Sequence, residues 1–165
     1  MPKTLHIQAE TGRPLALPLD RGDRGTDQTV AAMAAAAVHG SETTLVRAVA
    51  LAIREAAAGF PDAELRRVYV YVAARVRFGA DPRGVELVRS PGAMMEAIRR
   101  DGFARGDCDD RATLAAALLL SLGYVPVFVV MARESGIPFE HVFFGVLKDA
   151  AAEPSAANVV PFDPQ

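Results

Sequence analysis

The sequence predicts an α+β fold in which N-terminal helices precede a small antiparallel sheet packed on a central, cysteine-bearing helix. Apolar residues recur with helical spacing before Gly123, whereas the segments after it are rich in valine and phenylalanine and are separated by turn-forming residues. Helices first and strands afterwards are typical of an α+β domain. With 165 residues, of which 51% are apolar, the chain is long enough for one domain with a substantial core.

Residues 1–25 are expected to form an extended arm, because they hold three prolines and show no helical period. The glycine-containing run from Arg21 to Gly25 closes this arm. Residues 26–165 are expected to form a single domain, since this part of the chain contains no internal repeat and no linker-like composition.

Four helices are expected between the arm and residue 101, because capping residues and glycines bound segments of helical character. The third has the clearest period, with Leu65, Val68 and Val72 spaced along one face. The fourth begins with a serine cap that is followed by a proline in the first turn. The expected ranges run from Thr26 or Asp27 to Gly40, from Thr43 or Thr44 to Gly59, from Asp62 to Gly79, and from Ser90 to about Arg100.

A fifth helix is expected to begin at Cys108 and, being nearly apolar after Arg111, to form the buried centre of the fold. Residues 112–132 are almost continuously apolar and about as long as a membrane span. Gly123 and Pro126 interrupt this stretch, so we predict a helix, a turn and a strand in place of a membrane segment. The strands are expected at Val125–Met131, His141–Lys148 and Asn158–Phe162.

The composition argues against several classes of protein. There are 18 basic and 20 acidic side chains, a net charge of −2, and the arginines are scattered along the chain, so no nucleic-acid partner is expected. A single cysteine allows neither an internal disulfide nor a cysteine-rich zinc site. The first residues lack the apolar stretch of a secretory signal, which makes the cytoplasm the expected compartment.

The one cysteine, Cys108, lies at an expected helix start after a glycine-containing turn. Unpaired backbone N–H groups and the positive end of the helix dipole favour the thiolate there and lower the pKa of the thiol. The aspartates on both sides of Cys108 act in the opposite direction, so a nucleophile at this position also needs a general base. The polar surroundings favour a reactive thiol over a purely structural one, although buried, inert cysteines are common.

His141 is the candidate base, because it opens an apolar strand directly after a glycine–proline loop, where site residues often lie. His6 in the arm and His39 at a helix end both have ready structural explanations. A third residue, Asp163, follows the last expected strand, at a position suited to fixing the tautomer of the histidine. The alternative interpretations are an ordinary strand-end histidine and a turn aspartate before proline.

The aspartates Asp107, Asp109 and Asp110 allow a second interpretation, a Mg²⁺ or Ca²⁺ site beside which the cysteine is incidental. No convincing strand precedes them and no second carboxylate cluster follows, while aspartates in a first helical turn are expected from the helix dipole alone. We therefore expect neither a metal nor another cofactor. The tripeptide Arg-Gly-Asp occurs at residues 21–23 and again at 105–107, and chance explains it best because no secretion signal is present.

The run from Gly106 to Asp110, the apolar helix after it, the histidine strand and the closing Phe162-Asp163-Pro164 resemble the transglutaminase-like superfamily, which belongs to the papain-like cysteine enzymes. The resemblance covers roughly residues 22–165, and its combination of motifs is most specific over 105–163. Further segments are similar to the short versions found in phages and prophages: Gly25–Thr29, Tyr69–Arg77, Asp81–Leu87 and Ser90-Pro91.

The resemblance implies a papain-like fold with a triad of Cys108, His141 and Asp163. Cys108 would attack an amide or ester carbonyl of a peptide or protein, His141 would transfer the proton, and Asp163 would hold the imidazole. The backbone N–H of Cys108 would donate to the oxyanion, whereas the tryptophan that often provides a second donor is absent from this chain. The rival implication is a phage-associated structural or assembly protein that keeps the fold without catalysis.

Overall fold

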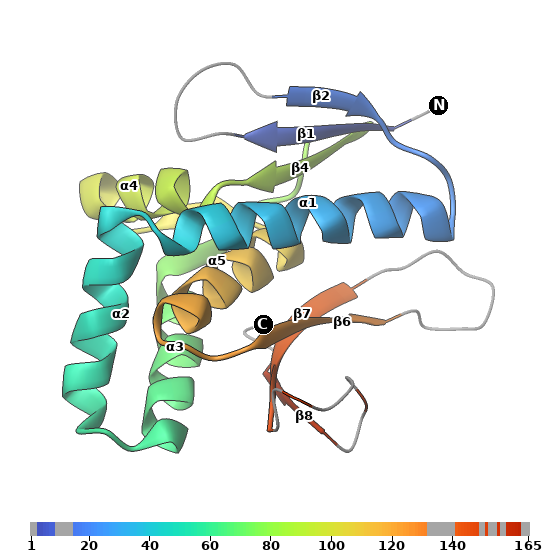
Figure 1. Cartoon of the computed structure of the whole chain (residues 1–165). Coiled ribbons are helices and arrows are strands. Elements are labelled where there is room, and N and C mark those ends of the chain that lie inside the picture. Colours follow the sequence, from blue (N-terminus) through green and yellow to red (C-terminus); the bar gives the residue numbers. More distant parts are fainter. Residues whose placement is uncertain are drawn as a thin grey trace.

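The computed structural model describes residues 3–8, 15–131, 141–148, 151, 155 and 158–162. Over these residues the chain is a mixed α+β fold, as predicted (Figure 1). The helices are α1 (Asp23–Ser41), α2 (Thr44–Ala57), α3 (Pro61–Arg75), α4 (Pro91–Asp101) and α5 (Cys108–Ser121). The strands are β1 (Thr4–Gln8), β2 (Leu15–Pro18), β3 (Val76–Phe78), β4 (Val85–Arg89), β5 (Ala104–Gly106), β6 (Pro126–Met131), β7 (His141–Leu147) and β8 (Val159–Phe162).

Helix α5 is the centre of the fold, which confirms the prediction for the cysteine-bearing segment. Every residue from Ala112 to Leu119 is buried, because α1, α2, α3 and β7 all pack around this helix. The apolar stretch 112–132 divides into α5, a turn at Gly123 and β6. Among the described residues, no helix combines the length and the apolar character that crossing a bilayer would require.

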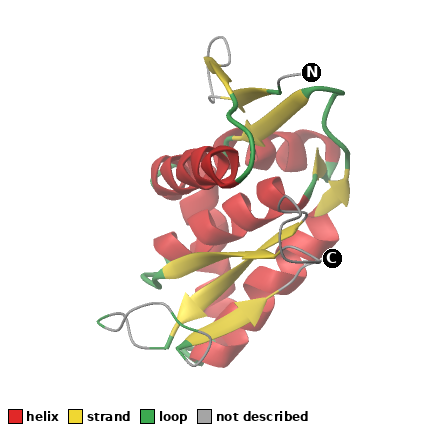
Figure 2. Cartoon of the chain, turned by 90° about the vertical axis from the view of Figure 1, so that its right-hand side faces the viewer, coloured by secondary structure: helices red, strands yellow, loops and turns green. Residues whose placement is uncertain are grey.

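An antiparallel sheet of order β6-β7-β8 covers one side of α5, as the sequence predicted (Figure 2). Its central strand β7 directs Val142, Phe144 and Val146 into the core. Phe144 lies opposite Phe162 in β8, and the two rings stack with their centroids 5.7 Å apart. Alternate residues of β7 therefore anchor the sheet on the helix, and the intervening residues face away from it.

Two further sheets were not predicted. Strands β1 and β2 form a hairpin within the expected N-terminal arm, and β1 also pairs in parallel with β4, which lies in a segment expected to be a loop. A second parallel pair joins β3 to β5. Each of these strands has only three to five residues and, the hairpin excepted, finds its partner far away in the chain, so no local periodicity indicates the pairing.

Helix boundaries agree with the sequence where a capping side chain sets them. The Ser90 hydroxyl oxygen accepts a hydrogen bond from the Ala93 backbone N–H at 3.1 Å, and Pro91 follows in the first turn of α4. The predicted start of α1 at Thr26 or Asp27 was wrong, because this helix begins at Asp23, within the expected arm. The predicted boundaries of α3 were also wrong: it begins at Pro61 without an Asp62 cap and ends at Arg75, not Gly79. The chain passes directly from α3 into β3, and pairing with β5 replaces the last expected helical turn.

Gly145 provides a test of how closely β7 and β8 approach. A Cβ atom at this position would overlap Val159 Cγ1 and would lie 3.0 Å from the Val160 carbonyl oxygen. We expect Gly145→Ala to lower the free energy of unfolding by about 2 kcal/mol, because neither neighbour can move without disturbing the ladder. Urea unfolding followed by circular dichroism measures this change.

A second substitution separates this overlap from a general intolerance of the strand. Val159→Ala removes the overlapping methyl group, so the double variant should recover part of the stability that Gly145→Ala loses. Wild-type stability in Gly145→Ala alone would contradict the close packing of the two strands.

Candidate functional site

Cys108 is the first residue of α5, immediately after β5 and the cap residue Asp107. It is a free, half-buried cysteine packed at the edge of the core. The turn before it is tight: a Cβ atom on Gly106 would lie 2.6 Å from the Asp110 Cβ atom, so this position requires glycine. The predicted location of the thiol, at a helix start behind a glycine, is therefore confirmed.

Three backbone N–H groups influence the Cys108 sulfur. The N–H groups of Val142 and Asp109, and that of Cys108 itself, lie near Sγ and favour its thiolate form. Two of these donors belong to the start of α5, whereas Val142 is the second residue of β7. Because Val142 directly follows His141, the structure brings the candidate nucleophile to the end of β7 that carries the candidate base.

His141 is the first residue of β7, lies opposite Met131 of β6, and is half-buried. The ring centroids of His141 and Phe143 are 6.1 Å apart, which fits the alternation that places these two side chains on the same face of the sheet. Val142, between them, is buried in the core towards α5. The Cys108 sulfur therefore lies beside the backbone of Val142, the residue that follows His141.

The third predicted member, Asp163, lies outside the described residues. The described part of β8 ends at Phe162, which is opposite Phe144 and three positions along β7 from His141. The structure therefore places Cys108 beside the end of β7 that carries His141, and the roles of Cys108, His141 and Asp163 remain predictions.

The electrostatic environment corrects one expectation about Cys108. Burial is the largest influence and raises the pKa of the Cys108 thiol above its ordinary value, and the negative charge of Asp107 raises it further. The three backbone N–H groups lower this pKa, but they do not outweigh burial. The helix start alone therefore leaves Cys108 protonated at neutral pH, and a base must remove the proton before the sulfur can attack.

The prediction for the neighbouring aspartates was also wrong, because they were expected to be ordinary residues of a first helical turn. Asp109 and Asp110 are only 2% and 0% exposed. Asp110 accepts a hydrogen bond from the Arg89 backbone N–H at 2.8 Å and pairs with the Arg89 guanidinium, which also lies 3.6 Å from Asp81. Burial nevertheless raises the pKa of Asp110 to about 7, although Arg89 opposes the shift.

Asp107 and Asp109 form a carboxyl pair at the same turn. Asp107 Oδ1 and Asp109 Oδ2 are both buried. When both carboxyl groups are ionised, neither oxygen has a hydrogen-bond donor among the described residues. A proton on Asp109 provides that donor, and burial together with Asp107 raises the pKa of Asp109 far above its usual range. Three aspartates ahead of an almost wholly apolar helix were the sequence signal for this buried cluster.

These carboxyl groups are engaged by one another and by Arg89. Within the described ranges, no group of three or more His, Cys, Asp or Glu side chains is arranged to hold a metal ion. The alternative interpretation of Asp107, Asp109 and Asp110 as a cation site gains no support from this geometry.

Comparisons with protein-family models, with curated proteins and with solved structures found no significant match. The function is therefore inferred from the residues that meet at the starts of α5 and β7.

Removing the charge of Asp107 should make Cys108 more acidic. We expect Asp107→Asn to shift the pH midpoint of Cys108 alkylation by iodoacetamide to lower pH, because the variant no longer repels the thiolate. The chain has one cysteine, so the rate of mass increase reports this site alone. Asp62→Asn, on the exposed surface of α3, is the matched control, and a midpoint that stays unchanged or rises in Asp107→Asn would contradict the assigned role.

Asp110 should contribute a measurable pH dependence to stability. Its pKa is about 7 in the folded protein and near the ordinary carboxyl value when unfolded, so the folded state binds more protons between pH 4 and 7. This contribution is fully present below the unfolded pKa and is lost as the pH rises through about 7. As the pH rises, the free energy of unfolding should fall less steeply in Asp110→Asn than in the wild type. The two slopes should differ by up to about 1.4 kcal/mol per pH unit.

Urea unfolding between about pH 5 and pH 8 measures this slope. The exposed Asp101→Asn should run parallel to the wild type, since the pKa of Asp101 is lowered, not raised. If Asp110→Asn also runs parallel to the wild type, Asp110 does not titrate in this range.

Proposed function

We propose that this protein is a cysteine-dependent acyl-transfer enzyme of the papain-like, transglutaminase-like type, acting on peptide or protein amides. The observation that carries the proposal is the approach of the Val142 backbone N–H to Sγ of Cys108, which brings the start of the cysteine helix beside the strand that begins with His141. In this proposal Cys108 is the nucleophile, His141 the general base and Asp163 the residue that orients the imidazole.

The raised thiol pKa gives His141 a necessary task. The imidazole takes the Cys108 proton as the sulfur forms a bond to the amide carbonyl carbon, and the carbonyl oxygen becomes an oxyanion. The proposed oxyanion donor is the backbone N–H of Cys108. Because Cys108 is the first residue of its helix, this N–H has no carbonyl acceptor within the helix. The amine then leaves with the proton from His141, and water or a second amine resolves the thioester.

The order of elements supports the superfamily proposal. A cysteine at the start of a central helix is followed by a histidine strand and then by a neighbouring antiparallel strand that leads to Asp163. The same order of residues and elements gives the sequence its resemblance to the transglutaminase-like superfamily, including the short phage and prophage versions. Water as acceptor gives a peptidase or amidase, and an amine gives a transglutaminase.

A non-catalytic structural or assembly role is the second candidate, and one observation favours it. Burial and Asp107 hold the pKa of the Cys108 thiol above its ordinary value, which is the environment of an inert cysteine unless a base is in reach. The two candidates therefore differ in whether His141 activates the thiol.

Trapping of an acyl-enzyme separates the two candidates. The chain is incubated with a panel of peptide amides, peptide esters and glutamine-containing peptides, and its intact mass is measured after acid quenching. We expect at least one donor to add its acyl mass to the wild type and none to add it to Cys108→Ala. His141→Ala should slow acylation by about 10²–10⁴-fold.

The control variant is His39→Ala, which removes a histidine from the last turn of α1 and should acylate at the wild-type rate. Absence of an adduct with every donor, together with alkylation of Cys108 no faster than a free thiol, would favour the structural role. Equal acylation of His141→Ala and the wild type would remove His141 from the proposed mechanism.

A further inference from the structure

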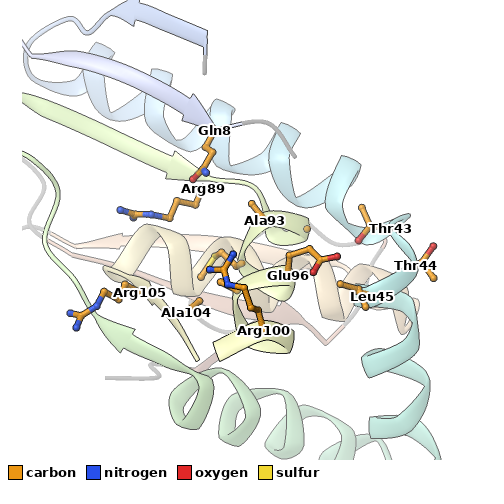
Figure 3. Close-up of a pocket in the computed structure, with 13 residues that line it drawn as sticks. Gln8, Thr43, Thr44, Leu45, Arg89, Ala93, Glu96, Arg100, Ala104 and Arg105 are labelled. Carbon is orange, nitrogen blue, oxygen red and sulfur yellow. The ribbon is translucent and has the colours of Figure 1, made fainter. Parts of the chain in front are cut away.

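The two-stranded sheet β3–β5 has one buried face and one exposed face. Val76 and Ala104 lie opposite one another and are almost fully buried. Alternation along both strands places the next pair, Arg77 and Arg105, on the other face, and both side chains are exposed. Figure 3 shows the Arg105 side chain at the edge of a cavity beside α4, extending away from Arg100. Two arginines therefore occupy directly opposite positions on one solvent-facing surface.

Phe103 holds the side chain of Arg77 in position. The guanidinium carbon of Arg77 lies 3.8 Å from the centre of the Phe103 ring, in the segment that leads into β5. A guanidinium group that stacks on an aromatic ring keeps the N–H groups along its edge available to carboxylate oxygens. Arg77 is thus oriented by the ring without losing its positive charge or its donors.

A third arginine, Arg75, lies beside this pair. It is the last residue of α3, and its Nη1 donates a hydrogen bond to the carbonyl oxygen of Gly102 at 3.1 Å, next to Phe103. Its side chain is exposed, and a guanidinium group has further N–H donors besides the one used here. Arg75, Arg77 and Arg105 together are called the arginine face below.

No described carboxylate neutralises the arginine face. None of its three members forms an ion pair within the part of the chain that the structure describes. Of the neighbouring carboxyl groups, Asp101 binds Arg100 through both oxygens, and Asp107 is bound to Asp109 at the turn before Cys108. Like charges opposite one another on neighbouring strands repel, so this arrangement is unfavourable until an anion covers it.

The chemistry of the arginine face fits an acidic segment of a peptide or protein. Each guanidinium group presents a fork of N–H donors that matches one carboxylate, and successive carboxylates of an acidic segment can bind different arginines. A nucleic acid requires a broad basic surface that follows its backbone. This face is only two short strands wide, on a chain with a net charge of −2, which favours the acidic segment.

We propose that the arginine face binds an acidic segment of a peptide or protein, whose carboxylates lie against Arg77 and Arg105, with Arg75 adding positive charge beside them. None of these three arginines has a role in the proposed acyl transfer. Cys108→Ala should therefore bind the acidic segment as tightly as the wild type does.

Binding is tested by fluorescence anisotropy at low ionic strength with fluorescein-labelled hexaglutamate, and with labelled hexaglutamine and oligothymidylate for comparison. We expect hexaglutamate to bind more tightly than either of the others. Arg77→Gln/Arg105→Gln should weaken its binding at least about tenfold, because both principal carboxylate partners are lost. Added salt should weaken wild-type binding because it screens the exposed charges.

The matched control is Arg66→Gln/Arg67→Gln, which removes the same charge from the exposed surface of α3 and should weaken binding less than about twofold. Arg105→Gln alone keeps the contact between Arg77 and Phe103 and should have an intermediate effect. Thermal unfolding checks that all variants remain folded. Failure of hexaglutamate to bind, equal weakening in the two double variants, equal binding of hexaglutamine, or tighter binding of oligothymidylate would each overturn the proposal.

Discussion

The burial of α5 on all sides is the constraint on which the rest of the structure depends. A helix that is apolar around its whole circumference must be enclosed, and here α1, α2, α3 and β7 enclose it. The polar first turn of this helix lies in the same interior, so the side chains of Asp109 and Asp110 are buried, although aspartate is charged in water at neutral pH. Arg89, at the end of β4, is the compensating cation, and it ties the β1–β2–β4 sheet to the start of the helix.

The same burial determines the chemistry of Cys108. The thiol lies at the boundary between the core and the starts of two elements, where desolvation opposes the thiolate and backbone N–H groups from α5 and β7 favour it. Because desolvation is the larger influence, a helix start is not sufficient to activate this cysteine. In the proposed function the decisive feature is therefore His141, since a base that accepts the proton during attack does not require a preformed thiolate.

Much of this arrangement could be predicted from local sequence signals. The apolar run after Arg111 indicated a buried helix, the serine–proline pair at residue 90 indicated the start of α4, and valine- and phenylalanine-rich runs indicated β6, β7 and β8. Each of these signals lies within the element that it specifies. The position of the cysteine relative to the histidine strand followed from placing that sheet on the buried helix.

The remaining features depend on partners that are distant in the sequence. β1 pairs with β4 across some 80 residues, and Asp110 owes its burial and its partner to a strand that was expected to be a loop. A first-turn aspartate is equally compatible with a solvated helix dipole and with a buried ion pair, so its sequence position does not distinguish the two. The cavity beside α4 (Figure 3) is lined by residues of five elements, β1, α2, β4, α4 and β5, and leaves no contiguous motif.

Stability and nucleophilicity in this fold have opposite dependences on pH. Burial raises the pKa of Asp81 to about 6 and that of Asp110 to about 7, so their protonated forms favour the folded state and this contribution is lost as the pH rises through those values. The Cys108 thiol, whose pKa is also raised, loses its proton only at higher pH. As the pH rises, a free thiolate would thus form only after the carboxyl groups of Asp81 and Asp110 have ionised. In the proposed mechanism, proton transfer to His141 during the reaction would remove this conflict, because the thiol would then react in the pH range where the turn that holds it is most stable.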